Sequence, residues 1–401
     1  MSDNVRYWLW LQRALGEGAN IKPIIDDFGS AKRLYEANIL EWKMSSSLTA
    51  RQINRLEEAK LTDIDEIIYT CNENGWRIID YEDSLYPSRL KEMINPPAVL
   101  FVDGEMPDVD SLITIGIVGT RKASEYAVKV THIMSRGIAE AGALVVSGGA
   151  LGVDTYAHRG AIAAGGKTIA VLGCGLGTKY LSQNSSLRNM IKNCGALVTE
   201  FEPFTPASKR TFPIRNRIIS GLSLGVLVVE AGDKSGSLIT AKYALEQNRD
   251  VYAVPASVLS TNFSGTNRLI DDGARVVTKP VHLIESYLYD YPTADASKIR
   301  SIDELASDET DKSANVEAKE DKYSFDTLEK GRKNRLEREE KERSLDGDLK
   351  AVYDSMDDNF THIDTIIEKS GLSSQRVTAS VIQLEMLGII EGASGKRYKK
   401  S

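Results

Sequence analysis

The sequence predicts an α/β protein whose core is a parallel sheet covered by helices on both faces. Between Ile113 and Val277, apolar runs of strand length alternate with amphipathic helical stretches, and glycine-rich turns join them. The apolar runs are continuous rather than alternating, which is typical of strands buried on both faces. Of the 401 residues, 42% are hydrophobic, which is sufficient for a substantial core.

Strands and helices are expected to alternate regularly through this block. Strands are expected at 113–118, 143–146, 168–172, 196–199, 226–229 and 251–254, and helices at 124–141, 153–164, 185–193, 214–222 and 237–247. In such sheets the loops at the carboxyl ends of the strands meet helix N-termini, and ligands gather there. Polar and glycine-rich phrases in these loops are therefore the candidates for function.

The segments before the sheet are predicted to form a helical bundle, 1–75, and an extended connector, 76–112. Apolar residues at helical spacing, separated by short polar breaks, indicate the bundle, and Trp8 and Trp10 are expected in its core. Pro87 and the Pro96-Pro97 pair resist helix and indicate the connector. The sheet domain is then expected to span 113–290.

After the sheet domain, a charged linker and a second small domain are expected. Residues 291–344 lose apolar content and mix both charges, which predicts a linker, with a solvated helix within 328–343. Residues 345–401 show three helices and a hairpin, the pattern of a winged helix, with 373–387 as the recognition helix. That helix offers Arg376 as its positive charge, so protein contact, a structural role and DNA binding all stay open.

Charge is distributed unevenly along the chain. The net charge is −7, yet residues 113–280 hold 19 Lys and Arg against 11 Asp and Glu. That block is therefore basic and the rest strongly acidic, and a local basic field can bind a polyanion despite an acidic total.

The composition also points to a compartment. The apolar runs are too short to span a membrane, and no signal pattern opens the chain. The three cysteines are odd in number and lack metal-ligand spacing, so we expect a cytoplasmic protein without a membrane partner.

Two phrases at expected strand ends are suited to meeting a phosphate. Arg121 follows the first strand, and Ser124 is the expected N-cap of the next helix, whose free N–H groups would face an anion. Ser147, Gly148 and Gly149 repeat the arrangement after the second strand, where glycines admit a close approach. Taken singly, each phrase is also compatible with a tight structural turn.

Two further patterns resemble enzyme motifs only weakly. Asp154 and His158 lie one helical turn apart, but no nucleophile accompanies them, so a buried Asp–His hydrogen bond is the favoured interpretation. The run 172–177 has the spacing Gly-x-Gly-x-Gly rather than GxGxxG and follows the third strand, which disfavours a nicotinamide site. Lys167 and Lys179 flank that run and add charge.

The most informative phrase is 212–220, which opens Phe-Pro-Ile-Arg-Asn-Arg. Arg215 and Arg217 flank Asn216. Basic residues beside an aromatic face are suited to holding a single nucleic-acid strand without reading its sequence. Lys209 and Arg210 precede Phe212 and extend the basic character.

Together these phrases resemble the DprA/Smf family of bacterial DNA-processing proteins. The resemblance is strong from about 85 to 290 and covers the flanking domains in outline. It is carried by Ile117-Val-Gly-Thr-Arg121, Val146-Ser-Gly-Gly-Ala150, Gly166-Lys-Thr-Ile-Ala-Val-Leu-Gly-Cys-Gly-Leu176, Phe212-Pro-Ile-Arg-Asn-Arg-Ile-Ile-Ser-Gly-Leu222, Gly236-Ser-Leu-Ile-Thr-Ala241 and Gly265-Thr-Asn-Arg-Leu-Ile270.

The resemblance implies an extended Rossmann-like domain, an N-terminal helical (SAM-like) domain and a C-terminal winged helix. It also implies a homodimer that binds and protects single-stranded DNA and loads RecA recombinase onto it during DNA uptake and recombination. From the matching motifs and from charge, the DNA-binding set is expected to be Arg121, Ser147, Gly148, Gly149, Lys167, Lys179, Lys209, Arg210, Phe212, Arg215, Asn216 and Arg217.

No catalytic residue, metal or cofactor is assigned, so a non-enzymatic protein is expected. Two alternatives stay open. One is a nucleotide-acting enzyme similar to the phosphoribohydrolases, although the glutamate that such enzymes need shortly after the glycines is missing from 150–160. The other is a transcription factor that acts through the winged helix.

Overall fold

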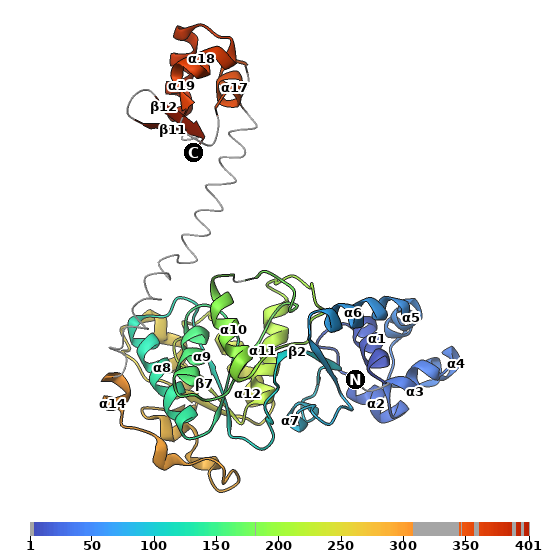
Figure 1. The fold of residues 1–401 in the computed structure, drawn as a ribbon. Coiled ribbons are helices and arrows are strands. Elements are labelled where there is room, and N and C mark those ends of the chain that lie inside the picture. Colours follow the sequence, from blue (N-terminus) through green and yellow to red (C-terminus); the bar gives the residue numbers. More distant parts are fainter. Residues whose placement is uncertain are drawn as a thin grey trace. The chain divides into compact units, whose positions relative to one another are not determined.

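The computed structural model describes residues 4–180, 182–307, 345, 347–356, 361–386, 390–393 and 397–400. They fall into two compact units, Met1–Glu309 and Thr310–Ser401 (Figure 1).

The first unit begins with the expected helical domain. Trp8 and Trp10 are 0% and 1% exposed, which confirms that both belong to its core. Asn38 and Thr49 form capping boxes that start two of the short helices. The domain consists of α1 (Val5–Leu15), α2 (Lys22–Phe28), α3 (Ala31–Glu36), α4 (Ile39–Met44), α5 (Ala50–Glu58) and α6 (Thr62–Glu73).

A sheet of nine strands follows among the described residues, in the order β1-β2-β6-β5-β4-β3-β7-β8-β9. The strands from β6 to β9 in this order are parallel, whereas β1 and β2 pair antiparallel at one edge. The strands are β1 (Arg77–Asp80), β2 (Val99–Gly104), β3 (Thr114–Val118), β4 (Leu144–Ser147), β5 (Thr168–Val171), β6 (Ala196–Thr199), β7 (Gly225–Val228), β8 (Asp250–Ala253) and β9 (Arg275–Val276).

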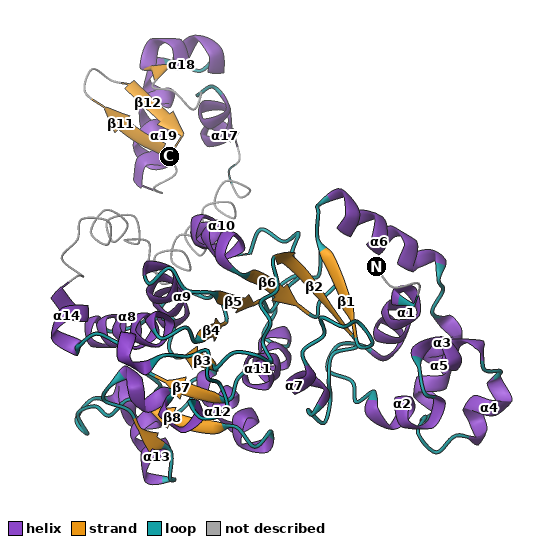
Figure 2. Ribbon diagram, turned by 60° about the horizontal axis from the view of Figure 1, so that its bottom comes forward, coloured by secondary structure: helices purple, strands orange, loops and turns teal. Residues whose placement is uncertain are grey.

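Helices cover both faces of the sheet, as predicted (Figure 2). Ile115 and Ile117 of β3 belong to the core under α8 and α9, whereas Val118 packs with Ile218 and Ile219 of α11 on the other face. The helices of this domain are α7 (Ser88–Lys91), α8 (Glu125–Glu140), α9 (Val153–Ala163), α10 (Ser185–Cys194), α11 (Thr211–Leu222), α12 (Ser237–Glu246), α13 (Ser264–Asp271) and α14 (Ile302–Ser307), with short 3₁₀ turns at Ser182–Asn184, Thr261–Phe263, Pro280–Leu283, Glu285–Tyr287 and Ala296–Lys298.

The elements of the central block agree closely with the expected ranges. The difference that matters most is α11, which begins at Thr211, three residues before the expected start at 214. Pro213 is tolerated there because the first turn of a helix has no intrahelical partners for its N–H groups. Phe212 therefore belongs to the first turn of a helix rather than to a loop.

The predicted connector, 76–112, is more than a connector. It contributes β1 and β2, and β2 pairs with β6 from Phe101↔Thr199 to Gly104↔Ala196. The prolines that indicated extended chain lie in the stretch between these strands, but Pro87 directly precedes the short helix α7, so the prediction of non-helical backbone holds for only part of this stretch.

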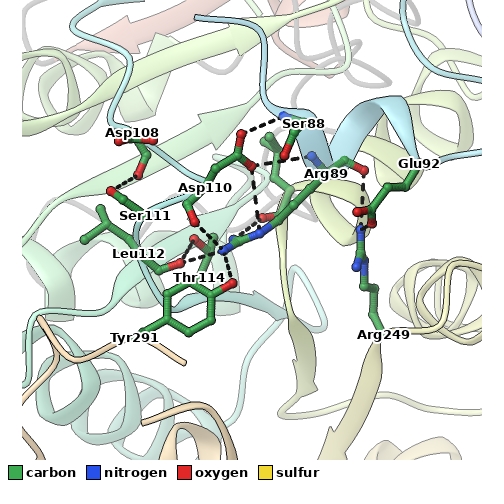
Figure 3. A network of polar contacts seen from close by, with 11 residues as sticks. Ser88, Arg89, Glu92, Asp108, Asp110, Ser111, Leu112, Thr114, Arg249 and Tyr291 are labelled. Carbon is green, nitrogen blue, oxygen red and sulfur yellow. Dashed lines mark hydrogen bonds and ion pairs between the residues drawn. The ribbon is translucent and has the colours of Figure 1, made fainter. Parts of the chain in front are cut away.

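A buried arginine fixes this segment to the sheet domain (Figure 3). Arg89 of α7 is 5% exposed and donates to the Leu112 carbonyl at 2.9 Å and to the Tyr291 hydroxyl at 2.8 Å. Asp110 accepts from the Ser88 N–H at 2.7 Å. These bonds join α7, the approach to β3 and the chain after 290.

The first part of the predicted linker belongs to the sheet domain. Residues 291–307 pack onto the sheet domain: the Asp295 N–H donates to the Ala141 carbonyl at 2.9 Å, Arg300 pairs with Glu140, and Leu305 is fully buried. The low apolar content of this segment did not indicate its packing, because one buried leucine and an ion pair are enough to hold it against the sheet domain. The expected helix at 328–343 lies outside the described residues.

The second unit contains the three helices and the hairpin expected of a winged helix. Val377, Val381 and Leu384 of the recognition-position helix are buried against the other helices. The elements are α17 (Gly347–Asp354), α18 (Ile363–Ser370), α19 (Ser374–Met386), β10 (Thr361–His362), β11 (Ile390–Ala393) and β12 (Arg397–Lys400), with strand order β10-β12-β11.

Arg89→Met is expected to lower the free energy of unfolding by roughly 2–4 kcal/mol, because the buried carbonyls lose a charged donor. Urea denaturation of the full chain measures this. Lys242→Met is the control, because the Lys242 side chain is 77% exposed and its pair with Glu246 should contribute less than about 0.5 kcal/mol. Equal losses in both variants would contradict the assigned role of Arg89.

Candidate nucleic-acid interface

A basic and aromatic cluster lies at the carboxyl edge of the parallel strands. The Arg121 guanidinium carbon lies 4.5 Å from the centre of the Phe212 ring, and Arg121 Nη1 donates to the Tyr180 hydroxyl at 3.2 Å. The rings of Tyr180 and Phe212 are 5.6 Å apart. The three side chains come from the loops after β3 and β5 and from the start of α11. We call them the Arg121 cluster.

Exposed cations border this cluster. Lys179 precedes Tyr180 in the chain, and Lys209 and Arg210 precede α11; all three are exposed, as is Arg121. Together with the Arg121 cluster, Lys179, Lys209 and Arg210 form what we call the basic edge. Tyr180 was absent from the predicted set, although an aromatic residue beside a lysine in a strand-end loop was the available signal.

Lys167 lies elsewhere. It is exposed, but it comes directly before β5, whereas Lys179 follows that strand. Because the strand separates them, Lys167 lies at the amino edge of the sheet, opposite the Arg121 cluster. Its nearness in sequence to the glycine run was misleading.

The start of α11 is held in place by hydroxyl groups. Thr211 Oγ1 donates to the Gly173 carbonyl at 2.6 Å, and Ser208 Oγ accepts from the N–H groups of Arg210 and Thr211 at 3.2 Å. This pins the helix N-terminus to the loop after β5. Phe212 is thereby presented beside Arg121 with little freedom.

Arg215 lies beneath this surface rather than on it. It is 5% exposed, and its Nη1 donates to the Val171 carbonyl at 2.7 Å. Burial lowers the pKa of Arg215, and the nearby Asp154 carboxyl opposes that shift. Its guanidinium carbon is 6.0 Å from the centre of the Phe212 ring, so it supports the interface from below.

The Ser147-Gly148-Gly149 turn has a different role from the expected one. A Cβ at Gly148 would overlap Nη1 of Arg215, and Ser147 is fully buried, donating to the Ile117 carbonyl at 2.6 Å. Gly149 adopts a φ of 64°, which favours glycine. These residues make room for Arg215, and their burial is contrary to the predicted contact with phosphate.

The predicted anion site at the start of α8 is occupied by a carboxylate of the protein itself. Ser124 caps α8 as predicted, accepting from the Ala127 N–H at 3.2 Å. The buried Glu230 carboxylate accepts from the Ser124 N–H at 2.8 Å and from its hydroxyl at 2.9 Å. Because Glu230 comes from the loop after β7, long-range pairing supplied a partner that local sequence could not reveal.

Arg217 and Asn216 also turn inward. Arg217 is 1% exposed, pairs with the buried Glu200, and donates to the Asn95 carbonyl at 2.6 Å. Asn216 Nδ2 donates to the Gly236 carbonyl at 3.2 Å. The expectation that the Arg215–Arg217 run faces DNA is therefore revised: it holds α11 to its neighbours.

Asp154 and His158 do not form the hydrogen bond that was expected. His158 Nδ1 lies 2.8 Å from Thr168 Oγ1, while the Asp154 carboxylate accepts from the Ala150 N–H at 3.3 Å. Burial, and secondarily Arg215, lowers the pKa of His158 to about 3. Burial raises the pKa of Asp154, and Arg215 opposes this. His158 is a neutral buried group near neutral pH.

Within the described ranges, no three His, Cys, Asp or Glu side chains gather in a way that could hold a metal ion. Across the same residues, every helix is too short or too polar to cross a membrane.

Comparisons with known proteins decide the family. A family model described as DNA recombination-mediator protein A matches residues 77–288, and a model of the DprA winged helix domain matches 337–396. Protein Smf of Synechocystis is 35% identical over 322 residues, which cover 80% of this chain and 79% of that protein. The chain belongs to the DprA/Smf family. The resemblance inferred from the sequence phrases is thus confirmed.

Other relatives in the DprA/Smf family agree. The DNA processing protein DprA of Bacillus subtilis is 40% identical over 219 residues, covering 55% of this chain and 74% of that protein. The X-ray structure of DprA from Streptococcus pneumoniae superposes with a TM-score of 0.61 at 30% identity, covering 72% of this chain and 99% of that one. The predicted fold class is confirmed.

The low pKa of His158 predicts a pH dependence of stability. In the unfolded chain His158 binds a proton below its ordinary pKa of 6.5, whereas in the folded chain it stays neutral down to about pH 3. Stability is therefore fully present above pH 6.5 and falls with pH, by about 2 kcal/mol between pH 7.5 and 5. In His158→Gln this part of the slope should disappear in urea titrations. Identical slopes in both proteins would show that His158 is not the group responsible.

Proposed function

We propose that this protein binds single-stranded DNA along the basic edge, without sequence preference, and loads RecA recombinase onto it. The observation that carries the proposal is the Arg121 cluster: an exposed guanidinium stacked on an aromatic ring, bordered by exposed cations. Cations neutralise phosphates and aromatic faces accept any base, which is the combination that single-strand binding needs.

The proposed contact set is smaller than the sequence suggested. It consists of Arg121, Lys179, Tyr180, Lys209, Arg210 and Phe212, with Arg215 beneath it. Exposure supports these assignments, because a phosphate in water can reach only cations that are themselves solvated. Membership of a family of recombination mediators supports the single strand as ligand and RecA as partner.

We further propose that the protein acts without catalysis, in the cytoplasm and as a homodimer. Asp154 and His158 are both buried and make hydrogen bonds to other groups rather than to each other, which argues against the acid–base pair that a phosphoribohydrolase-like activity would need.

For the winged helix we propose contact with protein rather than reading of duplex DNA. Arg376, the single basic residue of α19, is neutralised by Asp348 of α17. A duplex-reading helix needs free donors for base edges.

Arg121→Glu should weaken binding to an oligo-dT strand by about tenfold or more and flatten the dependence of log K on log salt by about one unit, because a phosphate contact is lost. Fluorescence anisotropy at several salt concentrations measures both. Lys167→Glu is the matched control: it makes the same charge change at the opposite edge and should bind as the unaltered protein does. Equal effects of both substitutions, or none, would contradict the proposed interface.

The full chain should speed the assembly of RecA filaments on DNA coated with single-strand-binding protein, because a mediator must hold the strand while RecA displaces the coat. Strand-dependent ATP hydrolysis by RecA reports assembly. The Arg121→Glu protein should give little stimulation, whereas Lys167→Glu should stimulate normally. Absence of stimulation by the unaltered chain, with DNA binding intact, would reject the RecA part of the proposal alone.

A further inference from the structure

Each glycine of the Gly-x-Gly-x-Gly run after β5 makes room for another segment of the chain. A Cβ at Gly173 would lie 2.8 Å from Cδ1 of Phe212, and one at Gly177 would lie 2.5 Å from Cε1 of Phe204. A Cβ at Gly175 would overlap the carbonyls of Glu202 and Pro203. Gly173 and Gly177, four residues apart, therefore each lie against a phenylalanine ring, and we call the run 173–177 the glycine floor.

The exposure of the Phe204 ring is not explained by the packing of the fold. It follows β6 and is 65% exposed, whereas Phe212 is half-buried beside Arg121. Hydration of an exposed aromatic face brings no folding free energy, so Phe204 has no evident structural role. A single exposed apolar residue is ordinary, and its setting must therefore carry the argument.

Two hydrogen bonds fix the backbone on either side of Phe204. The Gly175 N–H donates to the Thr205 carbonyl at 2.9 Å, and the Gly177 N–H donates to the Pro203 carbonyl at 2.7 Å. These two bonds clamp the chain on either side of Phe204 to the glycine floor. With its backbone fixed in this way, Phe204 loses only side-chain conformational entropy when its ring binds a planar group.

Three exposed cations of the basic edge lie near Phe204 in the loops that form this edge. Lys179 lies two residues after Gly177, and Lys209 and Arg210 follow Phe204 in the loop that leads to α11; all three are exposed. Cations beside a rigid exposed ring suit a phosphate chain whose bases stack, and they favour this ligand over an apolar protein segment.

We propose that Phe204 is a second base-stacking position of the interface, with the Phe212 ring as the first and the glycine floor fixing both. The proposal rests on the proposed binding of single-stranded DNA and adds to it where a base is held. Because phenylalanine has no hydrogen-bonding group, this position accepts any base.

The test is oligo-dT binding by full-length Phe204→Ala. Loss of one stacked base should weaken binding by about 5- to 150-fold. The salt slope should stay unchanged, because no phosphate contact is removed. On an oligonucleotide with abasic sites throughout, the substitution should have no effect. Tyr69→Ala is the matched control, because Tyr69 is also 65% exposed but lies on α6 of the helical domain.

A second variant gives a direct signal. Phe204→Trp should retain affinity, and its indole fluorescence should be quenched when oligo-dT binds but not when the abasic strand binds. The four native tryptophans all belong to residues 1–76, outside the glycine floor. Phe204→Leu, which keeps apolar volume without a π face, should behave as Phe204→Ala does.

The outcomes separate this proposal from the one on which it rests. If Phe204→Ala binds normally while Arg121→Glu loses binding, Phe204 is not a stacking position, its exposed ring is left to a protein partner, and the single-strand function stands. If both variants bind normally, the proposed function and this inference fail together. A changed salt slope in Phe204→Ala would mean that the substitution disturbs the cations, and would also overturn the stacking role.

Discussion

The buried ion pair between Arg217 and Glu200 is the interaction on which the arrangement of the first unit depends. Arg217 comes from α11 and Glu200 from the end of β6, and their side chains are 1% and 2% exposed. Arg217 also donates to the Asn95 carbonyl, and Glu200 accepts from the Gly18 N–H at 3.0 Å. Helical domain, connector and sheet therefore meet at one charged pair. A pair buried so completely is costly to break, by about 3–5 kcal/mol, because either partner alone would be an uncompensated charge.

The same helix carries the ring of the basic edge, so the buried pair and the interface are mechanically linked. Phe212 lies in the first turn of α11, Arg215 one turn later under the glycine of the β4 loop, and Arg217 at the domain junction. The inward residues fix the helix, and the N-terminal turn is then the part that faces the basic edge. Fixing α11 from within holds the half-buried Phe212 ring in one position, which lowers the entropic cost of the base stacking that we propose.

The glycines of the strand-end loops serve the packing of other side chains. Gly148 admits Arg215, and Gly173 and Gly177 admit aromatic rings. The sequence pattern of glycines after buried strands predicted a phosphate-binding turn. Phosphate binding and the packing of another side chain have the same physical cause, the missing Cβ of glycine. Which group takes the space depends on what the next crossover brings to that edge of the sheet.

The strands and helices of the central block, the winged helix and the family could be predicted from the sequence alone, because apolar periodicity, caps and motif order are local properties of the chain. The sequence also indicated the basic block and the candidate contact residues Arg121, Lys209, Arg210 and Phe212. Only the tertiary structure decided which cations are solvated. Successive helical residues point in directions about 100° apart, so Arg217 points about 140° away from Phe212, whereas Arg215 lies on the same side as Phe212 but is buried beneath its ring. Lys167 and Lys179, close in sequence, are separated by a strand and lie at opposite edges of the sheet. Burial and edge are properties of the assembled layers, and no local pattern encodes them.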